Sequence, residues 1–149
     1  MTTTSDTTPD TALDTDRLMA LWATPPADDA EALSEIRKLY TDPVVINGAT
    51  FAAEDLLARI RALQGAYRDV GHELIERVEA PGRLVIAFRM RGVHVGPLDT
   101  PLGTVAATGR AFEMRVIDVL TLAGGRVSAI TMVADELTQL RALGAITLA

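Results

Sequence analysis

The chain has 149 residues, carries a formal net charge of −6, and is 48% hydrophobic, with no cysteine and two histidines. Its length suits one domain with its own core, and the lack of cysteine excludes disulfides, thiolate metal sites and cysteine nucleophiles. The acidic balance argues against nucleic-acid binding, and no run approaches the roughly 18 to 20 apolar residues of a membrane-spanning helix. We therefore expect a cytoplasmic protein, without a metal site, that acts on a small molecule.

The N-terminal stretch MTTTSDTTPDTALDTD differs in composition from the rest of the chain. It is rich in Thr and Asp and has neither the basic start nor the apolar block of a secretory signal. We expect residues 1–15 to be disordered and residues 16–149 to form the domain.

Helical spacing of apolar residues dominates the first part of the domain. A first helix is expected over residues 15–26, where paired prolines stop it, and a second over residues 27–40, opened by two aspartates that suit unpaired N–H groups. A short strand over residues 42–48 ends in an Asn-Gly turn. A third helix follows over residues 50–67, with Thr50 as its expected N-cap.

After Tyr67 the apolar residues alternate with polar ones, which indicates strands. The pattern predicts four strands, a long loop and a closing helix that ends near Gly144, in this order: strands 71–80 and 83–94, loop 95–108, strands 109–122 and 126–135, helix 136–145. Helices followed by an antiparallel meander predict an α+β fold. In such a fold a curved sheet wraps around the N-terminal helices and can enclose an apolar pocket.

Alternation also assigns strand side chains to faces. Asp118 shares the apolar face of its strand with Met114, and His94 shares the apolar face of the preceding strand with Phe88 and Met90. A carboxylate on an apolar wall is costly to ionise, so its pKa rises towards the range useful for a general acid or base. An ion pair with a neighbouring arginine is the structural alternative for Asp118.

The remaining polar candidates each have a structural and a functional interpretation. Asp135 precedes the last helix and can be its N-cap or a pocket carboxylate. His94 can be a hydrogen-bonded core residue or a pocket group, His72 is expected on the surface, and Asn47 is first a turn former. We predict that the following side chains bind substrate on the pocket wall: Trp22, Tyr40, Asn47, Phe88, Met90, Met114 and Thr131.

Four stretches, YTDPVVING, FRMRGVHVGPL, TGRAFEMRVIDVLTLAGGRVSAI and DELTQLRALG, together resemble the SnoaL-like polyketide cyclases of the nuclear-transport-factor-two-like superfamily. The resemblance covers about residues 16–146 and is most specific at Arg91–Gly96, Thr108–Arg110 and Asp135–Gly144. It implies an α+β cone and a cofactor-free enzyme that closes a ring in a polyketide by an intramolecular aldol reaction. By this resemblance Asp135 is the acid/base and His94 a second pocket group, with Asp118 as a further catalytic candidate.

The chain departs from the family at Thr131, where relatives commonly have tryptophan, and its aromatic content of 4% offers little stacking for a flat polyaromatic substrate. An aliphatic polyketide, closed by an aldol step or by an oxygen nucleophile, fits this composition better. Two alternatives are an epoxide-opening enzyme similar to limonene-epoxide hydrolases and a non-catalytic binder of small molecules. Arg89-Met90-Arg91 lacks the acid of the Arg-x-Asp run in those hydrolases, which makes epoxide hydrolysis the less favoured reading.

Assembly is also suggested by the strand pattern. Ile117 and Val119 fall on the face opposite Asp118, which we expect to be the outside of the sheet. Exposed apolar residues on a sheet face are typical of an interface between copies, so we predict a homodimer through the sheet.

Overall fold

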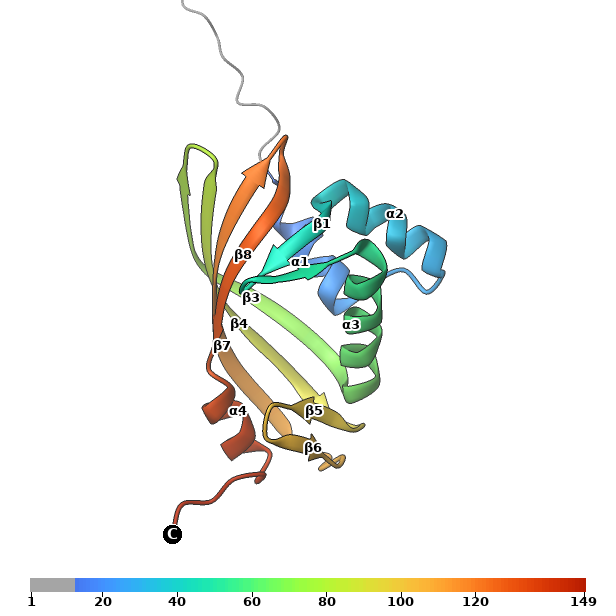
Figure 1. The fold of residues 1–149 in the computed structure, drawn as a ribbon. Helices are drawn as coiled ribbons and strands as arrows, with labels where there is room; N and C mark the ends of the chain where they lie inside the picture. Colours follow the sequence, from blue (N-terminus) through green and yellow to red (C-terminus); the bar gives the residue numbers. More distant parts are fainter. Residues whose placement is uncertain (1–12) are drawn as a thin grey trace, which may run out of the picture.

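Helices precede a set of long strands in the chain. The computed structural model describes residues 13–149, and within them it contains four helices and eight strands (Figure 1). In chain order they are α1 (Thr15–Ala23), α2 (Asp29–Leu39), β1 (Tyr40–Ile46), β2 (Ala49–Phe51), α3 (Ala53–Ala66), β3 (Tyr67–Ala80), β4 (Arg83–His94), β5 (Leu98–Thr100), β6 (Gly103–Val105), β7 (Ala111–Ala123), β8 (Arg126–Ala134) and α4 (Glu136–Ala142). None of these helices within residues 13–149 is long and apolar enough to span a bilayer.

Residues 13–15 lie ahead of the predicted start of the domain at residue 16. Asp14 is the N-cap of α1, where its carboxylate accepts a hydrogen bond from the Arg17 N–H at 3.0 Å. Leu13 is buried in the core, so residues 13–15 belong to the domain. The expected disorder of residues 1–12 lies outside the described residues.

Six strands form one mixed, curved sheet in the order β2-β1-β8-β7-β4-β3. Strand β1 runs parallel to β8, and every other neighbouring pair in this sheet is antiparallel. Helices α1, α2 and α3 cover one face of the sheet, and α4 and the β5–β6 hairpin lie at the same end of the molecule (Figure 1). This arrangement confirms the predicted α+β fold, with the N-terminal helices in the curve of the sheet.

The structure differs from the prediction at the short strands and at the start of β3. β2 and the β5–β6 hairpin, at three residues per strand, are too short to show an alternating pattern. β3 begins directly after α3 at Tyr67, four residues earlier than expected, and its register with β4 shifts twice, between Arg68 and Gly71 and between Leu74 and Glu76. Such bulges break the period of two on which face assignment depends.

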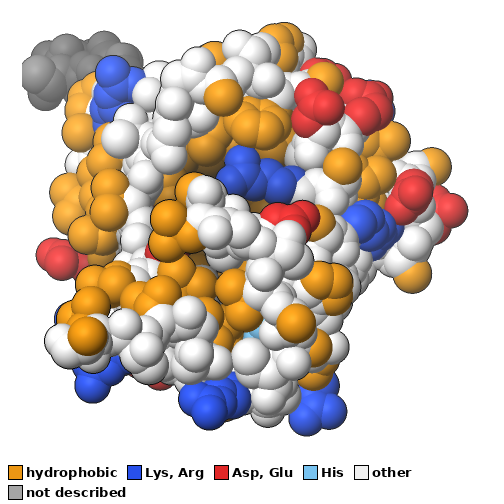
Figure 2. All heavy atoms as spheres, turned by 60° about the horizontal axis from the view of Figure 1, so that its bottom comes forward, with side chains coloured by type: hydrophobic (Ala, Val, Ile, Leu, Met, Phe, Trp, Pro, Cys, Tyr) orange, Lys and Arg blue, Asp and Glu red, His pale blue; other side chains and the backbone are white. Residues whose placement is uncertain are grey.

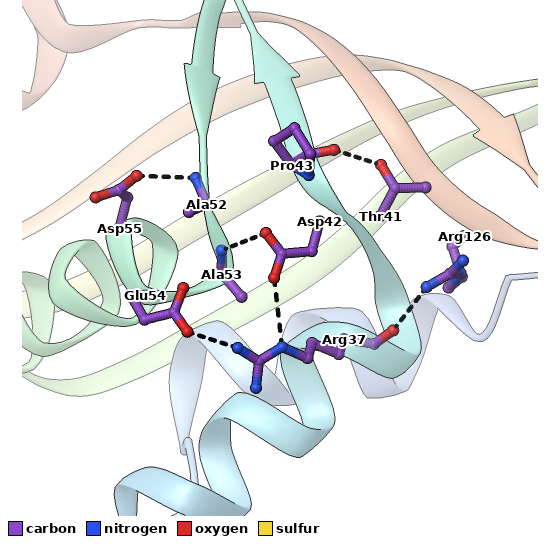
Figure 3. Close-up of polar contacts among 9 residues, drawn as sticks. All are labelled: Arg37, Thr41, Asp42, Pro43, Ala52, Ala53, Glu54, Asp55 and Arg126. Carbon is purple, nitrogen blue, oxygen red and sulfur yellow. Dashed lines mark hydrogen bonds and ion pairs between the residues drawn. The ribbon is translucent and has the colours of Figure 1, made fainter.

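The start of α3 also differs from the prediction (Figure 3). Thr50 lies in β2, and Ala52, which has no capping side chain, is the N-cap of α3. Two aspartates satisfy the free N–H groups instead: Asp55 accepts from Ala52 N–H at 2.8 Å, and Asp42 accepts from Ala53 N–H at 3.1 Å. The predicted cap at Thr50 is therefore wrong, because side chains from α3 itself and from β1 accept the hydrogen bonds of the first N–H groups of the helix.

Burial in the central strands follows the predicted alternation. Every second residue of β4 from Leu84 to His94 is buried. The apolar side chains of this set, Leu84, Ile86, Phe88 and Met90, share one core with Leu56 and Ile60 of α3. Burying a side chain of this size contributes about 1.5–3 kcal/mol to stability, so packing of α3 on the sheet stabilises the fold.

Candidate active site

A cavity of about 460 Å³ lies between the curved sheet and the helices. Its volume falls within the range of about 300–1,000 Å³ that is usual for small-molecule sites. Figure 2 views the end of the molecule that carries α4 and the β5–β6 hairpin, where hydrophobic side chains surround a hollow. Most of the lining is apolar, and the ionisable side chains on it are Tyr40, Arg59, Tyr67, His72, Asp99, Asp118 and Glu136.

Asp118 lies on the cavity wall in the middle of β7. The period of two places its side chain on the inner face, as the sequence predicts. Its Oδ1 atom is buried and has no hydrogen-bond partner within residues 13–149. Burial raises the pKa of Asp118 to about 6, because the charged form loses hydration that no donor replaces. No arginine within residues 13–149 pairs with Asp118, so the structural alternative of an ion pair is not supported.

Tyr40 and Trp22 form a hydrogen-bonded pair on the same cavity wall. The Trp22 Nε1–H donates to the Tyr40 hydroxyl oxygen at 2.8 Å. Tyr40 is 2% exposed, and burial, together with the charge of Asp118, raises its pKa, so the phenol stays neutral. Within residues 13–149 the phenol proton has no acceptor, and it is therefore available to a ligand.

The other wall residues predicted from the sequence fall into two groups. Phe88, Met90 and Met114 line the cavity from β4 and β7. Asn47 and Thr131 do not line it. The Asn47 side chain is occupied by the backbone of β8, donating to Met132 O at 3.2 Å and accepting from Met132 N–H at 2.8 Å.

Thr131 is exposed because alternation along β8 turns it outward and turns its neighbours Ile130 and Met132 to the cavity. Met132 pairs with Asp118 across the β7–β8 ladder, so a thioether and not a polar group stands beside the carboxyl. The substrate-binding predictions for Asn47 and Thr131 are therefore not supported by their positions.

Asp135 is an exposed helix cap rather than a cavity residue. Its carboxylate accepts hydrogen bonds from Thr138 N–H at 3.1 Å and from Thr138 Oγ1 at 2.7 Å, at the start of α4. These hydrogen bonds lower its pKa, because they stabilise the ionised form. The catalytic role expected for Asp135 has no support in this geometry, since an ionised, solvent-facing cap is poorly placed to exchange a proton with a ligand in the cavity.

His94 is completely buried and lies outside the cavity lining. Its Nδ1 lies 2.9 Å from Thr108 Oγ1 and accepts from Thr108 N–H at 3.3 Å, which ties the end of β4 to the segment before β7. Gly96 approaches the end of α3 so closely that a Cβ atom would overlap the carbonyl oxygen of Gly65. The Arg-Gly-x-His-x-Gly run is therefore a packing motif, and the expected pocket role of His94 is not supported.

Three cavity residues are not predicted by the sequence. His72, expected on the surface, lines the cavity and packs edge-on against Phe88, with a ring separation of 5.5 Å. Tyr67 and Gln139 are buried, line the cavity and share a 2.6 Å hydrogen bond from Gln139 Nε2 to the Tyr67 hydroxyl. The bulges in β3 hid the orientation of His72, and no local signal joins Tyr67 to a residue 72 positions later.

The chain matches the model of a known protein family. The family model of the SnoaL-like polyketide cyclases matches residues 8–143, so the chain belongs to that family. Within residues 13–149 no three histidine or acidic side chains converge as metal ligands. Comparison with curated proteins gave no match.

Solved structures confirm the fold at low identity. TsrD from Streptomyces laurentii is 21% identical with a TM-score of 0.74, and the match covers 89% of this chain and 92% of TsrD. A SnoaL-like polyketide cyclase from Agrobacterium tumefaciens is 16% identical with a TM-score of 0.70, covering 90% and 99% of the two chains. IdmH from Streptomyces antibioticus is 22% identical with a TM-score of 0.65, covering 87% and 97%.

Proposed function

We propose that the protein is a cofactor-independent cyclase that closes a ring in an aliphatic polyketide-type molecule, with Asp118 as general acid and base. One observation carries the proposal: the carboxyl group of Asp118 lies on the wall of an apolar cavity, its buried Oδ1 atom has no hydrogen-bond partner within residues 13–149, and its pKa is raised to about 6. A group with a pKa near the working pH is most effective in proton transfer. Membership of the SnoaL-like polyketide cyclase family supports the reaction class.

The chemistry needs no co-reactant. The Asp118 carboxylate takes a proton from the carbon next to a substrate carbonyl, which breaks a C–H bond and forms an O–H bond on Asp118. The resulting enolate attacks a second carbonyl carbon of the same molecule and forms the ring C–C bond. The new alkoxide then takes the proton back from Asp118, so the product is an isomer of the substrate.

Tyr40 is suited to stabilise the enolate. Its neutral hydroxyl accepts the Trp22 N–H bond, which directs the phenol proton away from Trp22. A donor held in place before the reaction stabilises developing negative charge without reorganising during the step. An apolar cavity wall can hold a flexible chain folded, which lowers the entropic barrier to ring closure.

Hydrolytic epoxide opening is less well supported. That reaction would need Asp118 and Asp135 to face the same cavity and share a water, whereas Asp135 caps α4 in solvent. Non-catalytic binding is the remaining alternative, and it predicts a protein that binds apolar ketones without transferring protons.

An α-proton exchange assay distinguishes the proposed cyclase from a non-catalytic binder, and it does not require the natural substrate. The protein is incubated in D₂O with a linear methyl ketone, undecan-2-one, and loss of the α-proton signal is followed by NMR. We expect Asp118→Asn to slow this exchange about 100-fold or more. Asp135→Asn is the matched control and should keep wild-type exchange, because Asn caps a helix about as well as Asp. Equal exchange by wild type and Asp118→Asn would refute the proposal, and no acceleration by wild type would favour a binder.

A further inference from the structure

The cavity contains a second set of polar groups that ring closure at Asp118 does not use. His72 of β3 lines the cavity, and its Nδ1 atom is buried without a hydrogen-bond partner within residues 13–149. Tyr67, also on β3, and Gln139 of α4 line the cavity as well, joined by their own hydrogen bond. An unpaired buried nitrogen is costly, so a partner supplied by a ligand would stabilise it.

The sheet register separates His72 from Asp118. His72 pairs with Met90, and Met90 pairs with Met114, so these three residues form one row across β3, β4 and β7. Asp118 lies four residues further along β7, which puts the two Cα atoms roughly 17 Å apart along the sheet, from standard strand spacing and rise. Tyr67 pairs with His94, beyond His72 on the side away from Asp118. Asp118 and the second polar set, at His72 and Tyr67, are therefore well separated along the cavity.

The surface between Asp118 and this second polar set is apolar. Phe88 and Val116 lie on the inner face of β4 and β7 between the two rows, Met90 and Met114 lie in the row of His72, and all four line the cavity. They offer contacts to an alkyl chain and no hydrogen-bonding group. A ligand that reaches from Asp118 to His72 is therefore aliphatic in its middle section.

The charges on the lining select against an anion. Three carboxyl groups, those of Asp99, Asp118 and Glu136, line the cavity with a single guanidinium, that of Arg59. Arg59 is exposed and already lies over the Phe51 ring, 5.3 Å from its centre. Burial lowers the pKa of His72, so its imidazole is neutral near pH 7 and can both donate and accept.

We infer that His72 is a recognition site for the far end of the substrate, and that the substrate is a linear, uncharged aliphatic chain with a hydroxyl or carbonyl there. The position of its reacting carbonyl at Asp118 rests on the proposed function. The χ2 torsion of histidine has a broad distribution, so the imidazole can rotate and bring either ring nitrogen to such a group. His72 thus contributes to binding and chain-length selection, and not to proton transfer.

Binding of a homologous series of probes tests this inference. Linear methyl ketones of increasing length, with and without a terminal hydroxyl, are titrated by calorimetry into wild type, His72→Phe and His72→Leu. At one chain length the hydroxyl should tighten binding to wild type by up to about tenfold, the value of one hydrogen bond. His72→Phe keeps an aromatic ring and should lose this gain while binding the plain ketones as before. His72→Leu gives the same comparison should the first variant fail to fold.

The outcomes separate this inference from the proposed function. A hydroxyl gain of the same size in wild type and in the His72 variants, or no gain in wild type at any length, would overturn it. Tighter binding of the matching chain with a terminal carboxylate would overturn the uncharged class. Asp118→Asn should keep the hydroxyl gain although it loses proton exchange, so failure of exchange alone would refute the catalytic proposal and leave the role of His72 standing.

Discussion

Replacing Asp118 by Asn should stabilise the folded protein at neutral pH, even though it removes the proposed acid and base. Burial raises the pKa of this carboxyl from 3.8 to about 6 in the folded chain, a rise of about two units. Each unit corresponds to about 1.4 kcal/mol of difference between the two protonation states. The ionised carboxylate therefore destabilises the fold by about 3 kcal/mol at pH 7, an order-of-magnitude value.

The pH dependence of this effect has a definite sign. Below pH 3.8 the carboxyl is protonated in both the folded and the unfolded chain, and its burial as a charge costs nothing. As the pH rises from 3.8 to about 6, the unfolded chain ionises first, and stability falls until the folded group ionises too. The free energy of unfolding of Asp118→Asn should therefore exceed that of wild type by an amount that grows over this window and is constant above it.

Urea unfolding followed by circular dichroism, at intervals between about pH 4 and pH 8, measures this difference. Asp135→Asn is the control, because hydrogen bonds lower the pKa of Asp135 and its contribution to stability is instead lost as the pH falls. Within this pH range the difference between Asp135→Asn and wild type should therefore stay almost constant, whereas the difference for Asp118→Asn should grow up to about pH 6. A difference between Asp118→Asn and wild type that does not change with pH would refute the assignment of Asp118 as a buried, unpaired carboxyl.

Three further predictions test separate parts of the structure. Trp22→Phe removes the N–H that orients Tyr40, so the exchange rate kcat should fall severalfold with little change in KM; an unchanged kcat would contradict the role of Tyr40. Gly96→Ala should lower the free energy of unfolding by about 1–3 kcal/mol, because its Cβ would overlap backbone, whereas Gly65→Ala has free space; equal melting temperatures would contradict this. We also propose that two copies pair through the outer face of the sheet, where Ile117 is 49% exposed, so Ile117→Glu should convert a dimer to a monomer in sedimentation, and a monomeric wild type would refute the pairing.

Physical patterns in the sequence predict the parts of this molecule that depend on local repetition. Alternation along β4 and β7 correctly places Phe88, Met90 and Asp118 on the inner face, because both strands pair without a bulge between them. The helices follow from their apolar spacing, and α2 also from its aspartate cap at Asp28, whereas the cap of α1 at Asp14 falls in the stretch expected to be disordered and α3 begins in a different way from the prediction. Family resemblance adds the cone, which no local pattern contains.

The site was harder to predict than the fold, because it depends on contacts between distant segments. Asp135 and His94 belong to motifs that resemble the family, yet one caps α4 and the other packs beside Thr108. A motif can persist because the fold needs it, so resemblance alone did not separate packing from chemistry. The sequence does not place His72 in the cavity, because bulges in β3 break the alternation. It also does not predict the hydrogen bond between Trp22 and Tyr40, which joins a helix to a strand 18 residues away.

The pH profile of α-proton exchange tests the central claim most directly. If Asp118 is the base, the rate in wild type and in Asp135→Asn should rise with pH through about 6, the pKa at which Asp118 ionises, and then level off. Asp118→Asn should show no such inflection and almost no exchange. An inflection near pH 6 that persists in Asp118→Asn, or one that disappears in Asp135→Asn, would contradict the assignment of Asp118 as the acid and base.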